Sequence, residues 1–465
     1  MAIPHEALFW FIVVWLFILG SVIGSFLNVC VYRIPQKERL FDQLRGLVSP
    51  GSHCPKCNTP IRKTDNIPIF GWLRLKGRCR NCQSRISFRY PLIEFLNGLL
   101  FVVVYWLEVP REFQTLPWES CTWTPLGPHL VEGWSDITML HLRYVYHMIL
   151  LEALLVASLI DLDTMTIPDG STLPAMILGI VGAFALGQMY LVPVWFQDSS
   201  FVKGFAPEAL HAPFGEMESL LNQQRIPHQR DVSLYGSGFE VPYWVKTSPH
   251  LHGLAVSLAG LLVGGGIVWG VRIIGYWTLR REAMGFGDVI LMALVGVFLG
   301  WQATLVAFFV APFFAMLVTV LRGITHLIFR GKGQGGYMPY GLYLSLGAMA
   351  VLLSWKWIWP IVGKWFSTGP FVPLMGIILL VLMVPALLFV QLLKRILGIP
   401  LYNTELEDFD EWPSADQLTY LAGEFVERDR QQWTTTNTWT GEAAAQGMIH
   451  EERWRSRDTA TGWPE

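Results

Sequence analysis

Four aspartates stand at the boundaries of long apolar segments, where two carboxylates could work together: Asp161, Asp163, Asp169 and Asp288. Two carboxylates that lie close together share one proton, because both cannot ionise easily. One of them can then act as general base on a water, while the protonated one polarises a carbonyl group. The residue types alone leave three interpretations open: an aspartic protease, an ion or proton transporter, or a structural role.

The partners that fit this chemistry best are Asp161 and Asp288, because each is the first acidic residue at its boundary. Gly285 and Gly287 precede Asp288 in a Gly-Phe-Gly-Asp string. Glycine lets a backbone turn sharply and pass close to another chain. We therefore expect both glycines to support the loop that carries the second aspartate and to let another group approach it closely.

The other acidic residues nearby have simpler interpretations beside the catalytic one. Asp169 follows Pro168, which cannot continue a helix, so Asp169 either supports the catalytic loop or caps the next helix. Asp163 is expected to be a solvated charge at the membrane boundary. Glu152 lies about two and a half helical turns before Asp161 and is expected to face the bundle interior beside a hydroxyl group or a tryptophan.

The second group of residues with chemical potential is a set of two C-x-x-C pairs: Cys54, Cys57, Cys79 and Cys82. Four thiolates around one ion form the tetrahedral site of a structural zinc. The alternatives are redox chemistry and free thiols. His53 could also replace one of the cysteines as a metal ligand. A closed four-cysteine site leaves no open position on the metal, so we expect a structural zinc.

The elements that position these residues are membrane helices. The chain has 465 residues, of which 52% are hydrophobic, and a mean hydropathy of +0.39, too apolar for an ordinary soluble protein. Its apolar blocks have the length that spans a bilayer. We predict an all-α polytopic membrane protein with about 8–9 transmembrane helices. The expected spans are 7–31, 91–107, 141–160, 171–191, 250–276, a hairpin over 287–321 that turns near 300–301, 340–355 and 373–393.

Charge distribution orients these spans. Residues 33–89 carry thirteen lysines and arginines against three acidic residues, so the positive-inside rule places this segment in the cytoplasm and the N-terminus outside. Alternation of the spans then brings Asp161 and Asp288 to the cytoplasmic face. The reducing cytoplasm also disfavours disulfides between the four cysteines. Nothing in this pattern indicates a nucleic acid among the partners.

The predicted domain organisation follows from these spans. A cytoplasmic zinc-binding lobe is expected between the first two helices. The boundaries are 7–31 for the first helix, 32–90 for the lobe, 91–355 for the membrane domain with extracytoplasmic insertions at 108–140 and 194–249, 373–393 for an additional helix, and 401–465 for an acidic, disordered cytoplasmic tail.

Several motifs together resemble those of the type IV prepilin peptidases, which are membrane-embedded leader peptidases and N-methyltransferases. They occur in the family's order over about half of the chain. The matching pieces are Gly24-Ser-Phe-Leu-Asn28, Ser49-Pro-Gly-Ser-His-Cys54-Pro-Lys-Cys57, Gly71-Trp72, Arg89-Tyr90-Pro91-Leu-Ile-Glu94, Ile160-Asp161 through Pro168-Asp169, Gly285-Phe-Gly287-Asp288 and Met338-Pro339-Tyr340-Gly341.

The resemblance implies an aspartic endopeptidase whose catalytic pair is Asp161 and Asp288. It implies cleavage of prepilin-like precursors after a glycine on the cytoplasmic face of the bacterial inner membrane. It also implies methylation of the new N-terminus with S-adenosyl-L-methionine as donor, an activity associated with the cytoplasmic lobe 32–90. The implied partners are pilus or type II secretion assembly machinery. Two rivals remain: a peptidase without methyl transfer, and a proton-coupled transporter. The transporter needs acidic residues through the membrane depth, whereas here they gather at one face.

Overall fold

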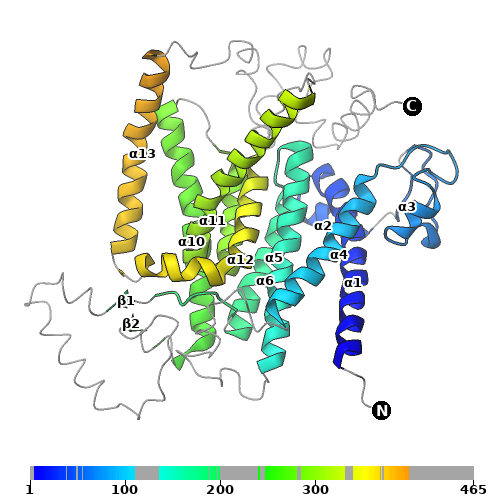
Figure 1. Cartoon of the computed structure of the whole chain (residues 1–465), viewed down its shortest axis with the longest axis horizontal. Coiled ribbons are helices and arrows are strands. Elements are labelled where there is room, and N and C mark those ends of the chain that lie inside the picture. The colour runs from blue at the N-terminus through cyan, green and yellow to red at the C-terminus, as the bar shows by residue number, and fades with distance from the viewer. Residues whose placement is uncertain are drawn as a thin grey trace, which may run out of the picture.

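The computed structural model describes residues 5–37, 39–48, 51–54, 56–109, 136–187, 189–195, 197–198, 239–240, 244, 247–279, 284–329, 339–366, 368 and 371–396. Apart from one pair of two-residue strands, the regular elements in these ranges are helices (Figure 1). The helices are α1 (His5–Arg33), α2 (Leu40–Val48), α3 (Phe70–Arg74), α4 (Arg89–Glu108), α5 (Asp136–Thr164), α6 (Asp169–Leu186), α10 (Pro249–Leu279), α11 (Phe286–Phe329), α12 (Tyr340–Phe366) and α13 (Phe371–Ile396). Strands β1 (Gln197–Asp198) and β2 (Phe239–Glu240) pair antiparallel, and short 3-10 turns occupy Ile34–Gln36 and Lys63–Asp65.

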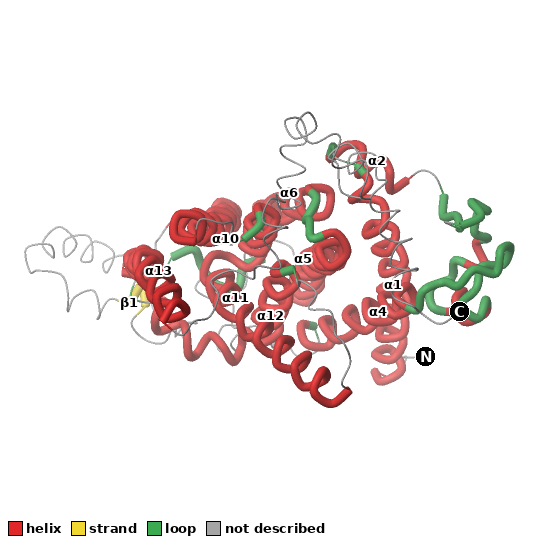
Figure 2. Tube along the Cα trace, turned by 90° about the horizontal axis from the view of Figure 1, so that it is seen from above, coloured by secondary structure: helices red, strands yellow, loops and turns green. Residues whose placement is uncertain are grey.

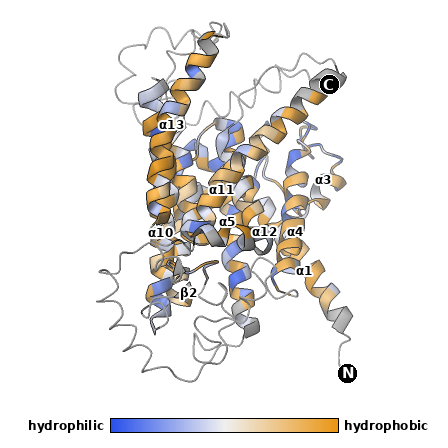
Figure 3. Cartoon of the chain, turned by 60° about the vertical axis from the view of Figure 1, so that its left-hand side comes forward, coloured by the Kyte–Doolittle hydropathy of each residue, from blue (hydrophilic) through white to orange (hydrophobic). Residues whose placement is uncertain are grey.

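The predicted class, a polytopic α-helical membrane protein, is confirmed. Seven helices in the described residues are long and apolar enough to cross a bilayer, and α12 contains a shorter apolar stretch, Tyr340–Trp355. One of the seven, α11, contains a break at Gly300, where φ is 78° and ψ is 167°. Hydrophobic residues run along all the long helices (Figure 3).

The break at Gly300 turns α11 back on itself. A Cβ on Gly264 of α10 would lie 2.2 Å from the carbonyl oxygen of Met292 and 3.0 Å from a methyl group of Thr304. In a straight helix, Met292 and Thr304 would be about 18 Å apart. They can meet the same point only if the chain reverses between them, which is the helical hairpin that the sequence predicts. Loop carbonyls stabilise the corner, because Trp301 and Gln302 donate hydrogen bonds to Val194 and Pro193.

The helices pack closely where small residues meet. A Cβ on Gly260 of α10 would lie 1.9 Å from the carbonyl oxygen of Gly296 in α11, so only glycine permits this approach. The buried core lies among α5, α6, α11 and α12, where Leu150, Leu294 and Leu344 are completely buried. Seen from above, α1 and α4 form a separate pair beside this core, next to the loops that carry the cysteines (Figure 2).

Several helix ends differ from the sequence-based boundaries. The helix α6 ends at Leu186, before the predicted end at 191, and α12 continues to Phe366, past the predicted end at 355. The predicted outer insertion 108–140 begins inside α4 and ends inside α5. Glu108 is completely buried and lies 2.6 Å from His147, which is also completely buried. The last residue of α4 is therefore a buried carboxylate with a partner and not part of an outer loop. Residues 110–135, 199–238 and the predicted tail 401–465 lie outside the described residues.

Candidate active site and metal centre

Asp161 and Asp288 converge on one point. Asp161 lies in the last turn of α5, Asp288 lies in the first turn of α11, and both are buried. A Cβ on Gly341, at the start of α12, would lie 2.6 Å from Asp161 Oδ2 and 3.3 Å from Asp288 Oδ1. The two carboxylates are therefore no farther apart than the sum of these distances. A side chain at position 341 would occupy the space between them, so glycine is required there.

Gly287 lets the start of α11 approach the loop between α5 and α6. A Cβ on Gly287 would lie 2.9 Å from the Cβ of Ile167. Ile167 also reaches Gly341, since its Cδ1 lies 3.0 Å from the position of a Cβ on that glycine. The sequence predicts that this glycine lets another group approach closely, and its close neighbour in the structure is a side chain of the same protein. Gly285 lies just before α11, outside the helix.

The loop between α5 and α6 is held by local hydrogen bonds. The amide of Met165 donates to the Asp161 carbonyl at 2.9 Å, and Met165 adopts a positive φ of 56°. The hydroxyl of Ser171 donates to the Pro168 carbonyl at 2.7 Å. Asp169 is exposed in the first turn of α6, where the helix dipole stabilises its negative charge. The N-cap residue of α6 is Pro168 and not Asp169. The support of the catalytic loop by Asp169 remains a prediction.

The prediction that Asp163 is a solvated charge is wrong. Its side chain is 6% exposed and its two oxygens accept hydrogen bonds from Arg89 Nη1 at 2.7 and 2.8 Å. A carboxylate is costly to bury unless it is paired, and the guanidinium at the start of α4 supplies that pair. The sequence reasoning missed this contact because 74 residues separate the two side chains.

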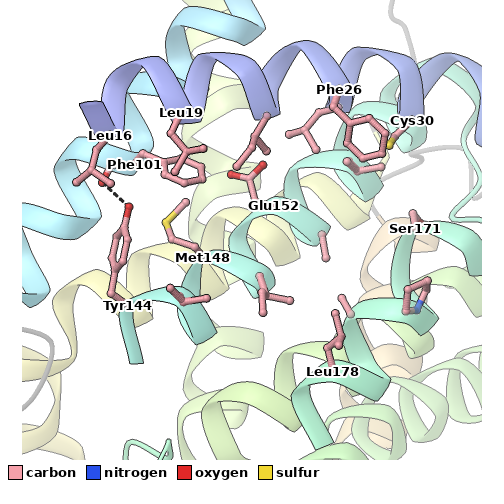
Figure 4. Close-up of a pocket in the computed structure, with 18 of the residues that line it drawn as sticks. Leu16, Leu19, Phe26, Cys30, Phe101, Tyr144, Met148, Glu152, Ser171 and Leu178 are labelled. Atoms are coloured by element: carbon pink, nitrogen blue, oxygen red, sulfur yellow. Dashed lines mark hydrogen bonds between the residues drawn. The ribbon is translucent and has the colours of Figure 1, made fainter. Parts of the chain in front are cut away.

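Glu152 points away from the two aspartates. Its Oε2 accepts a hydrogen bond from Asn97 Nδ2 at 3.2 Å, so its partner is an amide and not the hydroxyl or tryptophan that we expected. The side chain lines an apolar groove of about 750 Å³ between α1, α5 and α6 (Figure 4). Nine residues separate it from Asp161, which places the two side chains on opposite faces of α5. Glu152 is therefore outside the aspartate site.

The four cysteines form one cluster. The sulfur atoms of Cys54, Cys57, Cys79 and Cys82 all lie within 4.8 Å of one another. The distance from Cys54 Sγ to Cys82 Sγ is 3.8 Å, and that from Cys57 Sγ to Cys79 Sγ is 3.9 Å. Four sulfurs placed tetrahedrally at 2.3 Å from one ion are about 3.8 Å apart. The donor set and its spacing therefore fit a metal ion. His53 instead contacts the Gly51 carbonyl at 3.0 Å.

Two equivalent turns present the four sulfurs. The amide of Cys54 donates to Thr59 and its carbonyl accepts from Asn58, while Cys79 makes the same two bonds to Ser84 and Gln83. Asn58 and Gln83 both have a positive φ, which closes each turn. Each cysteine pair therefore folds locally, and the lobe needs only to bring two similar turns together.

Hydroxyl groups favour the thiolate form of two of these cysteines. The hydroxyl of Thr59, 3.3 Å from Cys57 Sγ, lowers the pKa of that thiol from 9.0 to about 6. The hydroxyl of Ser84, 3.1 Å from Cys82 Sγ, also lowers the pKa of Cys82. Metals bind cysteine as the thiolate, so these contacts favour metal binding near neutral pH.

Comparison with known proteins identifies the family of the chain. Residues 18–107 match the model of the bacterial peptidase A24 N-terminal domain, and residues 148–206 and 221–320 match that of the type IV leader peptidase family. A prepilin leader peptidase/N-methyltransferase of Klebsiella pneumoniae is 31% identical over 295 residues, which cover 62% of this chain and 86% of that protein. The chain belongs to the type IV leader peptidase family. It is therefore an enzyme, as the motifs predict.

Other relatives extend over more of the chain. Proteins with the same name from Aeromonas salmonicida (28% identical) and Neisseria gonorrhoeae (27% identical) align with 72% and 75% of this chain and with 89% and 93% of their own lengths. No solved structure matches the chain.

The sequence reasoning did not identify Gly341 as part of the aspartate site, although it belongs to one of the family motifs. The signal that could have found it is a glycine after Pro339-Tyr340, where a new apolar segment begins. The sequence gives no such signal for Ile167, because isoleucine is common next to membrane helices. Its role follows only from its contact with Gly287.

Proposed function

We propose that this protein is a membrane aspartic endopeptidase that cleaves the leader of type IV prepilin-like precursors after glycine on the cytoplasmic side. We further propose that it methylates the new N-terminal residue. The observation that carries the proposal is the convergence of Asp161 and Asp288 on the space beside Gly341. The names of the relatives, prepilin leader peptidase/N-methyltransferase, support the substrate and the second activity.

In the proposed mechanism the two carboxylates share one proton. The ionised carboxylate takes a proton from a water, which attacks the scissile carbonyl carbon. The protonated carboxylate donates its hydrogen to the carbonyl oxygen and so stabilises the developing charge. The C–N bond then breaks, and the amine leaves with the proton that the general base had taken. The other carboxylate takes its proton back from a hydroxyl of the tetrahedral diol, which becomes the carboxylic acid product, and the pair again shares one proton. Burial of both side chains supports this proposal, because a low dielectric favours proton sharing over double ionisation.

Two cofactors belong to the proposal. Cys54, Cys57, Cys79 and Cys82 would hold a structural zinc with no open position, so the metal would stabilise the lobe and take no part in bond cleavage. S-adenosyl-L-methionine would supply the methyl group, whose acceptor is the amine that cleavage releases. This order of events explains why both activities would occur in one chain.

The proposed location is the bacterial inner membrane, with the N-terminus outside and the cysteine lobe and both aspartates in the cytoplasm. The excess of basic residues in 33–89 supports this orientation. The lobe and the aspartates lie at the same end of the helices, because Arg89 at the start of α4 contacts Asp163 at the end of α5. The expected partners are the precursors and the pilus or type II secretion assembly machinery.

One experiment tests both activities. Purified protein is incubated with a prepilin-type precursor and S-adenosyl-L-methionine, and the N-terminus of the product is determined by mass spectrometry. We expect cleavage after glycine and a mass increase of one methyl group. Asp161→Ala and Asp288→Ala should each reduce cleavage by about 10³-fold or more, since each removes half of the acid–base pair.

Methylation of a precut peptide provides the control for folding, because we expect both aspartate variants to retain it. Cleavage at the wild-type rate by either variant would remove the proposed pair. Cleavage without any mass increase would leave a peptidase that lacks methyl transfer.

A further inference from the structure

The loop between α5 and α6, which follows Asp161, is held from outside the peptidase helices. The N-terminal unit, α1 to α4, contacts this loop region at two points, one before and one after residues 165–168. Arg89 binds the end of α5, and Gln43 binds the start of α6. We propose that Gln43 and Arg89 are positioning residues for the peptidase reaction, because together they fix the loop between α5 and α6 and thereby place Asp161 against Asp288. This inference rests on the proposed function.

Gln43 makes a specific contact with the peptidase unit. Its Oε1 accepts a hydrogen bond from the amide of Gly170 at 2.7 Å, and its Nε2 donates to the carbonyl of Lys37 at 2.7 Å. The side chain is 3% exposed, although it lies on a nine-residue helix outside the membrane bundle. The Gly170 amide is one of the unpaired donors of the first turn of α6, so a side chain from another element satisfies it.

The contact also depends on a glycine. A Cβ on Gly170 would lie 2.4 Å from Gln43 Oε1 and 3.1 Å from Gln43 Cβ, so another residue at this position would push the Gln43 side chain out of the contact. Gly170 and Gln43 are therefore matched, and the resulting contact fixes the position at which α6 begins.

Arg89 holds the other end of the loop. It donates to both oxygens of Asp163 and approaches the carbonyl of Leu159 at 3.4 Å. Asp161 lies between these two contact points on α5. Because Nη1 binds the Asp163 carboxylate while Nη2 approaches the Leu159 carbonyl, the planar guanidinium holds a side chain and the backbone of α5 at once, which a single point charge would not do. The last turn of α5 is consequently oriented by the first residue of α4.

Between these anchors, Ile167 transmits the loop position to Asp288. Ile167 packs against Gly287, one residue before Asp288, and its Cδ1 also reaches the space beside Gly341. Displacement of the loop would therefore move Asp161 and the start of α11 relative to each other. A misplacement of about 1 Å in such a pair can cost roughly 100-fold in rate.

The test uses the full-length protein and a prepilin-type precursor. In Gln43→Met, kcat for cleavage should fall roughly tenfold with little change in KM, because the side chain acts on catalytic geometry and not on substrate affinity. Gln43→Glu keeps the Oε1 acceptor but loses the Nε2 donor to the Lys37 carbonyl, so it should restore only part of kcat. Gln36→Met is the matched control, since Gln36 donates only to the Tyr32 carbonyl of its own segment at 2.9 Å.

Arg89 is tested with its partner. Arg89→Gln leaves Asp163 buried without its guanidinium, so the double variant Arg89→Gln/Asp163→Asn is compared with both single variants. We expect strongly non-additive losses of kcat, because the two side chains act as one unit. Arg89→Lys should recover only part of the rate, since one ammonium group cannot reach both the Asp163 carboxylate and the Leu159 carbonyl in the same geometry.

Hydrogen exchange of the Gly170 amide gives a readout independent of activity. The amide should exchange at least tenfold faster in Gln43→Met than in the wild type or Gln36→Met. An unchanged kcat in Gln43→Met, or equal losses in Gln43→Met and Gln43→Glu, would overturn the positioning role while leaving the proposed function intact. Failure of the wild type to cleave would instead refute the proposed function, and the exchange measurement would still test the contact.

Discussion

The cysteine cluster and the aspartate pair are assembled in opposite ways. Each half of the cluster is a six-residue turn that forms its own hydrogen bonds, Cys54 to Thr59 and Cys79 to Ser84. The aspartates are 127 residues apart in the sequence and meet only because helices α5, α11 and α12 pack at one point. A metal ion can hold local turns together by its own bonds, whereas two like charges repel and must be held by the fold around them. The structure of the cysteine cluster should therefore depend on its four sulfur ligands, and that of the aspartate pair on the packing of the surrounding helices.

The largest expected effect is the removal of a cysteine that is proposed to bind the metal. Cys79→Ser, or treatment with a strong chelator, should release the metal and unfold the lobe, since metal binding in such small lobes contributes on the order of 10 kcal/mol. Metal content by mass spectrometry and proteolysis of residues 51–88 are the measurements. Cys30→Ala serves as control, because Cys30 lies in α1 outside the cluster. A Cys79→Ser protein that retains one tightly bound metal per chain would contradict the four-ligand site.

The next effect concerns packing at the aspartates. Gly341→Ala should reduce cleavage by about 100-fold, because the methyl group would lie 2.6 Å from Asp161 Oδ2 and would force the carboxylates apart. The measurement is kcat with a prepilin-type precursor. Gly376→Ala is the matched control, since a Cβ there meets nothing within 4 Å. Equal activity in the two variants would show that the carboxylates do not need the space beside Gly341.

A smaller effect is expected at Gly287. Gly287→Ala brings a methyl group to 2.9 Å from the Cβ of Ile167, so the start of α11 must shift by a few tenths of an ångström. We expect a loss of roughly tenfold in kcat. The double variant Gly287→Ala/Ile167→Ala should recover much of the rate, because the smaller side chain removes the collision. If the double variant is no faster than Gly287→Ala alone, the glycine is required for another contact, such as the approach of the substrate.

The smallest effect concerns the ion pair that braces the lobe. Arg80 donates to both oxygens of Asp65 at 2.7 and 2.6 Å and lowers the pKa of that carboxyl below its usual value. A lowered pKa in the folded state contributes stability above the unfolded pKa of about 3.9, and this stability is lost as the pH falls through the folded pKa. Asp65→Asn should therefore lower the thermal midpoint of the lobe slightly at pH 7. The difference from the wild type should disappear in acid, as followed by thermal unfolding at several pH values.

Hydropathy, charge and short motifs predicted much of this protein because each is a local property of the chain. The apolar blocks identified the membrane helices, and Gly300 marked the turn of the hairpin. The C-x-x-C spacing identified the cluster, since two turns with that spacing each place a pair of sulfurs correctly. The position of each aspartate at a helix boundary also followed from the pattern of apolar residues.

Tertiary structure alone decided what surrounds the aspartates. Gly341 leaves the space in which they meet, Arg89 converts Asp163 from an expected surface charge into a buried pair, and Gln43 reaches Gly170 across 127 residues. A sequence records which groups need a partner, but the partner depends on how distant helices pack. Charges and amides at helix ends can be satisfied by water or by protein, and only the packing of α2, α4, α11 and α12 determines which they receive.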